Sequence, residues 1–526
     1  MKLYLFCAYN AIMNYEYLNV GRAGDLRGKD RIVYRLFEIL PGFLTWLTLV
    51  GIVLGSWLFP VGMAFFIIAF DLYWVIKSIY LSVHLRISWK KMRHYLELDW
   101  TERLRNFKYN HIWQMVLLPF YKEGWDVVSA TIESLIESKW PKNRMIIVLA
   151  FEERAGETAE KIAQEAHKKY KDKFAHFLIT KHPENLPGEM AGKGSNIAFA
   201  AEEARKEILD KNNIKYDDVL VSAFDIDTRV YPQYFLSLTW HFLTSEKPYR
   251  SSFQPVPVYN NNIWEAPAFS RVVATSGTFW QMIEQERPKR LTTFSSHSMS
   301  FRALYEVGYW QKNMVNEDAR IFWNSLLKFD GDYQVVPISY PVSMDANLAP
   351  TFWQTAKNVY KQQRRWTYGT AENAVYILFG FLKNKKISLR TKIHHLFVQF
   401  EGGWSLTTNP LIIFFLGWLP LTLGGENFNK TLLSYNLPRI TSDIMTVAMT
   451  GLIFSAIVST TLLPSRPAGK KSHKYIFMIL QWILIPVTIP IFGSLPSIDA
   501  QTRLMLGKYL GFWVTPKYRK KDENKV

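Results

Sequence analysis

The feature that most constrains the fold of this chain is the gathering of its apolar residues into long runs near both ends. Ile39 to Phe59 contains no charged residue and is long enough to cross a bilayer as a helix. Pro60 interrupts this run, and Val61 to Ile76 follows with Asp71 as its single charge. Mean hydropathy over the whole chain is only −0.06, so polar segments must balance the apolar ones. The pattern predicts a transmembrane hairpin ahead of a water-soluble region.

Basic residues flank the apolar runs instead of forming one patch. The formal net charge is +18, and 19 Trp residues accompany it. The Lys and Arg residues gather in five segments: Arg22–Arg35, Arg86–Arg93, Lys383–Lys392, Lys470–Lys474 and Lys517–Lys521. This is the positive-inside pattern, and it predicts that these flanks face the cytosol from the cell membrane. It also argues against nucleic acid as a partner, because a nucleic-acid binder concentrates its basic residues on one surface.

The middle of the chain, from about Asp99 to Met344, has the composition of a soluble α/β domain. Short apolar runs at Met115–Phe120, Met145–Ala150 and Val219–Phe224 alternate with helical segments. Such alternation predicts a mainly parallel sheet with helices on both faces. Ligands of these sheets bind at the carboxyl ends of the strands.

The C-terminal third returns to apolar and aromatic composition. Thr351 to Leu382 is rich in aromatic and basic residues and predicts one or two amphipathic helices on the membrane surface. Apolar stretches follow at Gly402–Gly425, Ile444–Ser465 and Tyr475–Ile498. Three complete spans would place the basic tail outside the cell. Either Tyr475–Ile498, which contains three prolines, is a broken re-entrant segment, or a fourth span exists.

Two carboxylates follow the third apolar run of the soluble region. Asp225 and Asp227 flank one residue at the predicted strand end. Carboxylates at positions i and i+2 of an extended turn can share a hard divalent cation, Mg²⁺ or Mn²⁺, and leave positions for diphosphate oxygens. The alternative is an ordinary solvated turn.

A second pattern, Q-x-x-R-W, lies in the aromatic and basic segment. Gln362, Arg365 and Trp366 are spaced i, i+3 and i+4, so they share one face if the segment is helical. The cation and amide can hold an anionic leaving group, and the indole can stack under a sugar ring.

The order of these motifs resembles the membrane-embedded family 2 glycosyltransferases, which include the cellulose, chitin and hyaluronan synthases. The resemblance implies an α/β GT-A (nucleotide-diphospho-sugar transferase) domain inserted between the transmembrane helices of a multi-pass membrane protein. The triplet Asn316-Glu317-Asp318 matches the family's T-E-D, with Asn in place of Thr. The resemblance implies that Asp318 is the general base and that Glu317 contributes to substrate binding. Acidic capping of a helix N-terminus is the alternative.

Further matches concern the nucleotide sugar. Gly192–Asn196 resembles a family segment whose Lys meets the diphosphate, which implies substrate contacts for Lys193 and Asn196. The resemblance also implies that Glu152 contacts the nucleotide base and that Tyr121 stacks near it. An exposed acidic loop is the alternative for Glu152.

The C-terminal segment Phe512–Lys517 resembles the F-x-V-T-x-K gating loop of cellulose-synthase-like enzymes. The resemblance implies that Thr515 and Lys517 close over the bound donor and exclude water. A basic tail on anionic lipid is the alternative.

The sequence therefore predicts an inverting, metal-dependent membrane glycosyltransferase that moves a sugar from a nucleotide-diphosphate sugar, UDP by resemblance, onto a growing cell-surface polysaccharide. The alternatives are a single transfer to a lipid acceptor and a non-catalytic scaffold or sugar sensor. The expected partners are the donor, a glycan or lipid acceptor and the bilayer. The predicted parts are a cytosolic segment at 1–36, a hairpin at 37–84, the catalytic domain at 99–345, interface helices at 346–400, a transmembrane region at 401–500 and a cytosolic tail at 501–526.

Overall fold

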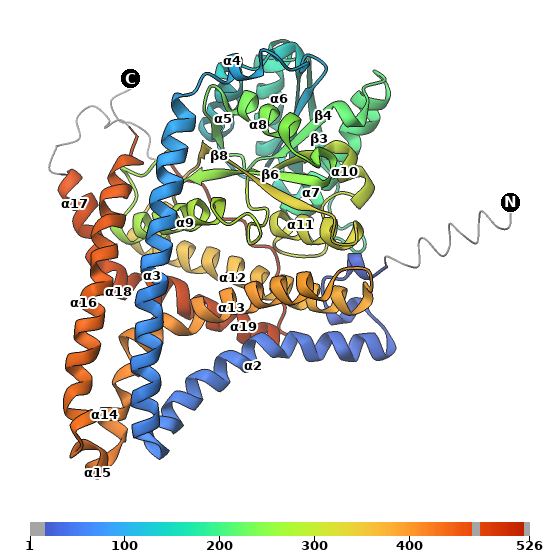
Figure 1. Ribbon diagram of the computed structural model, residues 1–526. Helices are drawn as coiled ribbons and strands as arrows, with labels where there is room; N and C mark the ends of the chain where they lie inside the picture. The colour runs from blue at the N-terminus through green and yellow to red at the C-terminus, as the bar shows by residue number, and fades with distance from the viewer. Residues whose placement is uncertain (1–15, 465–473, 520–526) are drawn as a thin grey trace.

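The computed structural model describes residues 16–464 and 474–519. An α/β domain lies above a layer of long helices, and helices from the two ends of the chain lie together in that layer (Figure 1). The first residues of the predicted cytosolic segment, part of the predicted C-terminal transmembrane region and the end of the predicted tail lie outside the described residues.

The α/β domain is built on one eight-stranded sheet with the strand order β3-β2-β1-β4-β7-β6-β8-β5. The strands are β1 (Trp113–Phe120), β2 (Met145–Glu152), β3 (His176–His182), β4 (Val219–Ala223), β5 (Arg229–Val230), β6 (Ser251–Val258), β7 (Ser298–Ser300) and β8 (Gln334–Ser343). Strands β1 to β4 are parallel where they pair, but β7 is antiparallel to both β4 and β6. The sheet is mixed but mainly parallel, as expected: the pairs β1–β2, β1–β4, β2–β3 and β6–β8 are parallel, and the shorter pairs β4–β7, β6–β7 and β5–β8 are antiparallel.

Both faces of the sheet are covered, which explains why its strands have no polar alternation. In β1, Val116 and Leu118 pack into one hydrophobic cluster, and Met115 and Leu117 pack into the cluster on the other face. The helices of the domain are α4 (Trp100–Leu104), α5 (Trp125–Glu137), α6 (Glu157–Tyr170), α7 (Lys193–Ala204), α8 (Tyr234–Thr244), α9 (Ala268–Gln285), α10 (Phe301–Val307) and α11 (Glu317–Lys328). The expected α/β architecture is therefore present.

The long helices flank and underlie this domain (Figure 1). The helices outside the domain are α2 (Gly28–Leu58), α3 (Pro60–Glu97), α12 (Phe352–Lys383), α13 (Leu389–Phe414), α14 (Leu419–Leu423), α15 (Gly425–Asn429), α16 (Leu432–Thr461), α17 (Lys474–Leu480), α18 (Ile485–Ile489) and α19 (Leu495–Met505). Among the described residues, Gly28–Leu58, Pro60–Glu97 and Tyr475–Met505 are long and apolar enough to cross a membrane. A fourth candidate is the pair Leu389–Phe414 and Leu416–Leu423, bent by 49°.

Helix α12 docks against the start of α11 through a glycine. A Cβ atom on Gly369 would lie 2.3 Å from the Asn316 Cβ, so only a residue without a side chain allows this approach. The cap of α12 is Thr351, whose side chain accepts a hydrogen bond from the Gln354 amide. The contact brings the Q-x-x-R-W segment of α12 toward the acidic start of α11.

Candidate active site

One cavity of about 800 Å³ lies between the carboxyl ends of the sheet and the helices beneath them. Every residue that the sequence predicted for the site lines it. These residues are Tyr121, Glu152, Lys193, Asn196, Asp225, Asp227, Glu317, Asp318, Gln362, Arg365, Trp366, Thr515 and Lys517. Large concave cavities of this kind are the usual place for substrate binding. Residues from seven separate parts of the chain therefore converge on one space.

Lys193 links the two acidic motifs. Its Nζ lies 2.6 Å from Asp225 Oδ1 and 2.9 Å from Asp318 Oδ2. Glu317 Oε1 is 3.9 Å away from the same nitrogen. Lys193 is the first residue of α7, whose amide groups add positive potential at that end of the helix. The ammonium group thus joins the end of β4 to the start of α11.

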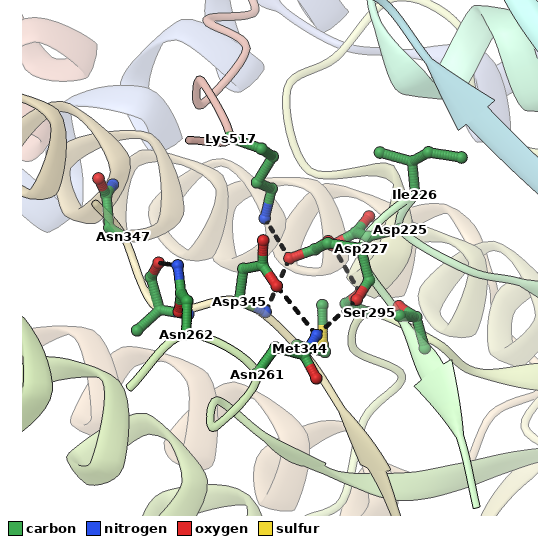
Figure 2. A network of polar contacts seen from close by, with 12 residues as sticks. Asp225, Ile226, Asp227, Asn261, Asn262, Ser295, Met344, Asp345, Asn347 and Lys517 are labelled. Carbon is green, nitrogen blue, oxygen red and sulfur yellow. Dashed lines mark hydrogen bonds and ion pairs between the residues drawn. The ribbon is translucent and has the colours of Figure 1, made fainter. Parts of the chain in front are cut away.

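A second lysine reaches the site from the C-terminal tail. Lys517 Nζ lies 2.7 Å from Asp227 Oδ2, and Figure 2 shows its side chain descending onto the carboxylate. Asp225 accepts a hydrogen bond from Ser295 Oγ at 2.8 Å. The contact of Ser295 with Asp225 was not predicted, because a serine in the loop before β7 carries no local signal that it reaches the loop after β4.

Burial and the two lysines set the protonation of these acids. Burial alone raises the pKa of Asp225, but the charges of Lys193 and Lys517 outweigh it and hold that pKa below its usual range. At Asp227, burial and the neighbouring Asp345 and Asp225 charges outweigh Lys517, so the pKa is raised. Burial and the adjacent Asp318 charge raise the pKa of Glu317 to about 7. The site therefore keeps its negative charge only with cations close by.

The Asp225–Asp227 pair has the donor chemistry for a hard divalent cation. Asp227 is fully buried, and its Oδ1 has no hydrogen-bond partner among the described residues. Carboxylate oxygens are the ligands that Mg²⁺ and Mn²⁺ prefer. In the described part of the chain, no group of three or more His, Cys, Asp or Glu side chains is placed to hold a metal ion. The protein would thus supply two carboxylates and leave the remaining ligand positions to the substrate or water.

The Glu317-Asp318 pair opens α11, but neither side chain caps it. Asn316 occupies the cap position without a side-chain capping hydrogen bond. The Asp318 side chain is 16% exposed, faces the cavity, and is held by Lys193. His297 Nδ1 lies 3.7 Å from Asp318 Oδ1 but donates to the Phe294 carbonyl oxygen at 2.9 Å. Its Nε2 accepts from the Trp310 indole at 3.2 Å, so both ring nitrogens are engaged, as expected for a packed histidine.

The Q-x-x-R-W residues lie on the cavity side of α12, as their spacing predicts. Trp366 packs edge-on against Phe294, with ring centroids 5.8 Å apart. Arg365 Nη1 donates to the Val315 carbonyl oxygen at 3.4 Å, while Arg365 Nε has no partner among the described residues. Gln362 Oε1 accepts from Asn347 at 3.4 Å. The indole thus lines the cavity, and Arg365 retains an unused donor for a ligand.

The cavity lining also includes the residues predicted to meet the nucleotide. Glu152 is the last residue of β2 and is buried, so the alternative of an exposed acidic loop is wrong. Arg154 donates two hydrogen bonds to the Glu152 carboxylate, from Nε to Oε2 at 2.7 Å and from Nη2 to Oε1 at 3.0 Å. The Arg154 guanidinium lies 4.5 Å from the centre of the Tyr121 ring. Asn196 donates to the Ala150 carbonyl oxygen at 3.1 Å. Arg154 therefore contacts two of the predicted nucleotide-binding residues, Glu152 and Tyr121.

The tail segment 512–519 lies over the site. A Cβ atom on Gly192 would lie 2.5 Å from Phe512 Cγ, so the aromatic ring packs directly on the turn that begins α7. The Phe512 ring also sits 4.7 Å from the Arg365 guanidinium carbon. Thr515 is buried, and its Oγ1 has no hydrogen-bond partner within the described ranges. The tail therefore contacts both the turn before α7 and helix α12.

The close approach at Gly369 gives a testable prediction. Gly369→Ala forces α12 away from Asn316, and overpacking of this kind costs about 1–3 kcal/mol of stability. We expect a lower apparent Tm of the purified protein and weaker sugar transfer, because α12 and α11 carry facing parts of the site. Gly51→Ala is the matched control, since a Cβ atom there meets nothing within 4 Å. Equal Tm values for the two variants would contradict the prediction.

Known protein families and structures are also similar to this chain. The family model described as "Glycosyl transferase family group 2" matches residues 220–492, more than half of the chain. A poly-beta-1,6-N-acetyl-D-glucosamine synthase of Staphylococcus epidermidis is 27% identical over 145 residues. That match covers 27% of this chain and 32% of the relative, so it spans about a third of that protein's length.

Two solved structures are similar at low levels. A mannosyltransferase from Pyrobaculum calidifontis, in complex with GDP-Man and Mn²⁺, has 11% identity, a TM-score of 0.41, and coverage of 73% of this chain and 99% of that one. Residues 1–349 of S. aureus TarS, in complex with UDP, have 11% identity, a TM-score of 0.34, and coverage of 66% and 91%. TM-scores this low carry no argument of their own. The family match does, and the chain belongs to glycosyl transferase family group 2.

Proposed function

We propose that this protein is an inverting, metal-dependent glycosyltransferase of the cytoplasmic membrane that extends a cell-surface polysaccharide. The donor is a nucleotide-diphosphate sugar, with UDP favoured by resemblance, and the catalytic domain lies in the cytosol. The observation that carries this proposal is the convergence of three motifs on one cavity: the D-x-D pair Asp225 and Asp227, the E-D pair Glu317 and Asp318, and the Q-x-x-R-W residues of α12. The candidate membrane-spanning helices on either side of the α/β domain support a multi-pass arrangement.

The reaction needs one base and one stabilised leaving group. Asp318 takes the proton from the acceptor hydroxyl as that oxygen attacks the anomeric carbon. The bond between the anomeric carbon and the diphosphate oxygen breaks, and the nucleoside diphosphate leaves with the electron pair. Lys193 and Arg365 provide cationic donors for the diphosphate, and Trp366 supports the acceptor ring. A divalent cation on Asp225 and Asp227, when bound, would supply charge stabilisation for the leaving diphosphate. A single displacement of this kind inverts the anomeric configuration.

The part of the cavity that lies along α13 gives information on the chemistry of the acceptor. The cavity continues along one face of α13, where its lining includes the polar residues Gln399, Glu401, Ser405 and Asn409. The Asn409 amide nitrogen is buried without a partner within the described ranges, as a hydroxyl-bearing ligand requires. The same stretch also presents the apolar side chains of Leu406, Ile413, Phe414 and Phe492. The polar residues of this lining favour a glycan acceptor. The apolar residues favour the second candidate function, a single transfer to a lipid acceptor.

Product length separates these two functions. Membranes containing the protein are supplied with labelled nucleotide sugars and Mg²⁺ or Mn²⁺, and products are resolved by size. We expect a ladder of oligomers from wild type. Trp366→Ala should shorten this ladder, because the growing chain loses its stacking platform, a contact of about 1–3 kcal/mol by analogy with other aromatic stacking. One lipid-linked sugar as the sole product would replace the polysaccharide proposal with the lipid one.

A further inference from the structure

A third acidic residue lies beside the D-x-D loop, outside every motif noted so far. Asp345 follows β8, and its side chain is only 1% exposed. Its backbone amide donates to Asp227 Oδ2 at 2.9 Å. Asn261 Nδ2 donates both to Asp345 Oδ1 and to the Asp227 carbonyl oxygen, each at 2.9 Å. Figure 2 shows Asp345 and Asn261 packed around Asp227 in this way. The Asp345 residue therefore holds both the side chain and the backbone of Asp227.

The charge of Asp345 is neutralised by the C-terminal tail. Arg519 forms a two-pronged contact, with Nη2 2.9 Å from Oδ1 and Nε 3.1 Å from Oδ2. Its Nη1 also donates to the Asp126 carbonyl oxygen at 3.0 Å. Arg229 of β5 bears charge nearby, yet within the described ranges it makes no ion pair with Asp345. A buried carboxylate needs such a counter-charge, and a forked guanidinium contact is the strongest form of it.

Lys517 and Arg519 are two residues apart and contact adjacent carboxylates, Asp227 and Asp345. We propose that Asp345 is a positioning residue for the D-x-D loop and, through Arg519, the docking point of the tail. Its backbone and Asn261 fix Asp227, and its carboxylate holds Arg519 so that Lys517 reaches Asp227. The catalytic consequence of positioning Asp227 rests on the proposed function, whereas the docking of the tail on Asp345 does not.

The docking is tested on the full-length protein without donor. Trypsin is added, and mass spectrometry follows the rate of cleavage after Lys517, which reports the undocked tail. We expect Arg519→Gln and Asp345→Asn each to raise this rate about tenfold, the scale of one charged hydrogen-bonded contact. The double variant should be no faster than either single one, because both remove the same contact. Arg519→Lys should restore part of the protection, since it keeps the charge and loses the fork.

Arg503→Gln is the matched control, because Arg503 pairs with Asp499 at 2.6 Å within α19, away from the D-x-D loop. It should leave cleavage after Lys517 unchanged. Unchanged cleavage in Arg519→Gln and Asp345→Asn would overturn the docking, and so would additive rates in the double variant. An enzyme without turnover on any donor would instead overturn the proposed function and leave the cleavage result standing.

Turnover separates the two roles of Asp345. The Asn variant keeps an oxygen for Asn261 and loses the charge for Arg519, while Asp345→Ala loses both. We therefore expect similar tail cleavage in the two variants but a lower kcat, with little change in donor KM, for Asp345→Ala. Equal kcat values would overturn the positioning role.

Discussion

Asp318→Asn is expected to lower sugar transfer by about 100- to 10,000-fold, the usual contribution of a general base. The amide has the shape of the carboxylate but cannot take the proton of the acceptor hydroxyl. Asp318 faces the cavity and lies 2.9 Å from Lys193, so the substitution changes the chemistry at the reacting end of the site. The measurement is release of the nucleoside diphosphate by membranes carrying wild-type or variant protein, at saturating donor.

A matched control separates lost chemistry from lost fold. Asp332→Asn removes a carboxylate of the same domain that pairs with Lys247 at the surface, where its side chain is 54% exposed. It should leave turnover near the wild-type value. Donor KM should change little in Asp318→Asn, because the base acts on the acceptor. Turnover equal to wild type in Asp318→Asn would remove the base assignment.

Asp227→Asn is expected to have the second large effect, a loss of transfer of about 100-fold or more, since metal-assisted charge stabilisation is worth several kcal/mol. Asp227 is fully buried, and one of its oxygens has no partner among the described residues. An amide in its place offers one weak ligand where a carboxylate offers two oxygens. The measurement is turnover against Mn²⁺ and Mg²⁺ concentration, with chelation of the metal as the limiting case.

Asp227 also pairs with Lys517, so its proposed role in binding the cation must be separated from its role in holding the tail. Lys517→Met removes the ion pair and leaves both D-x-D carboxylates in place. If Asp227 serves the cation, Lys517→Met should retain more activity than Asp227→Asn and should keep its dependence on divalent metal. Equal losses in the two variants, together with turnover that ignores chelation, would mean that Asp227 serves the tail alone.

The α/β domain could be predicted from the sequence because the patterns that mark its strands and helices are local. The apolar runs that became β1, β2 and β4 are buried on both faces, so their composition alone marks them. The spacing of Gln362, Arg365 and Trp366 likewise placed them on one side of a helix. The antiparallel strand β7 was missed, because Ser298–Ser300 is short, polar in part, and extended only through its neighbours.

The contacts between the site residues could not be predicted from local patterns. Short motifs predicted candidate acids and bases, but not that Lys193 joins Asp225 to Asp318 or that Lys517 reaches Asp227. Glu152 was placed near the nucleotide by resemblance, and only the fold shows it buried and paired with Arg154. The catalytic roles of these residues remain predictions.

The sequence by itself determined which segments are apolar, where the buried strands β1, β2 and β4 arise, and which short motifs carry charge, because each depends on neighbours a few positions away. The tertiary structure alone decided that Ser295, Asp345 and Arg519 belong beside the D-x-D loop. Asp345 and Arg519 are 174 positions apart in the chain, and their contact exists only after the sheet, α12 and the tail have packed. Packing of distant segments, unlike periodicity, leaves no local pattern to read.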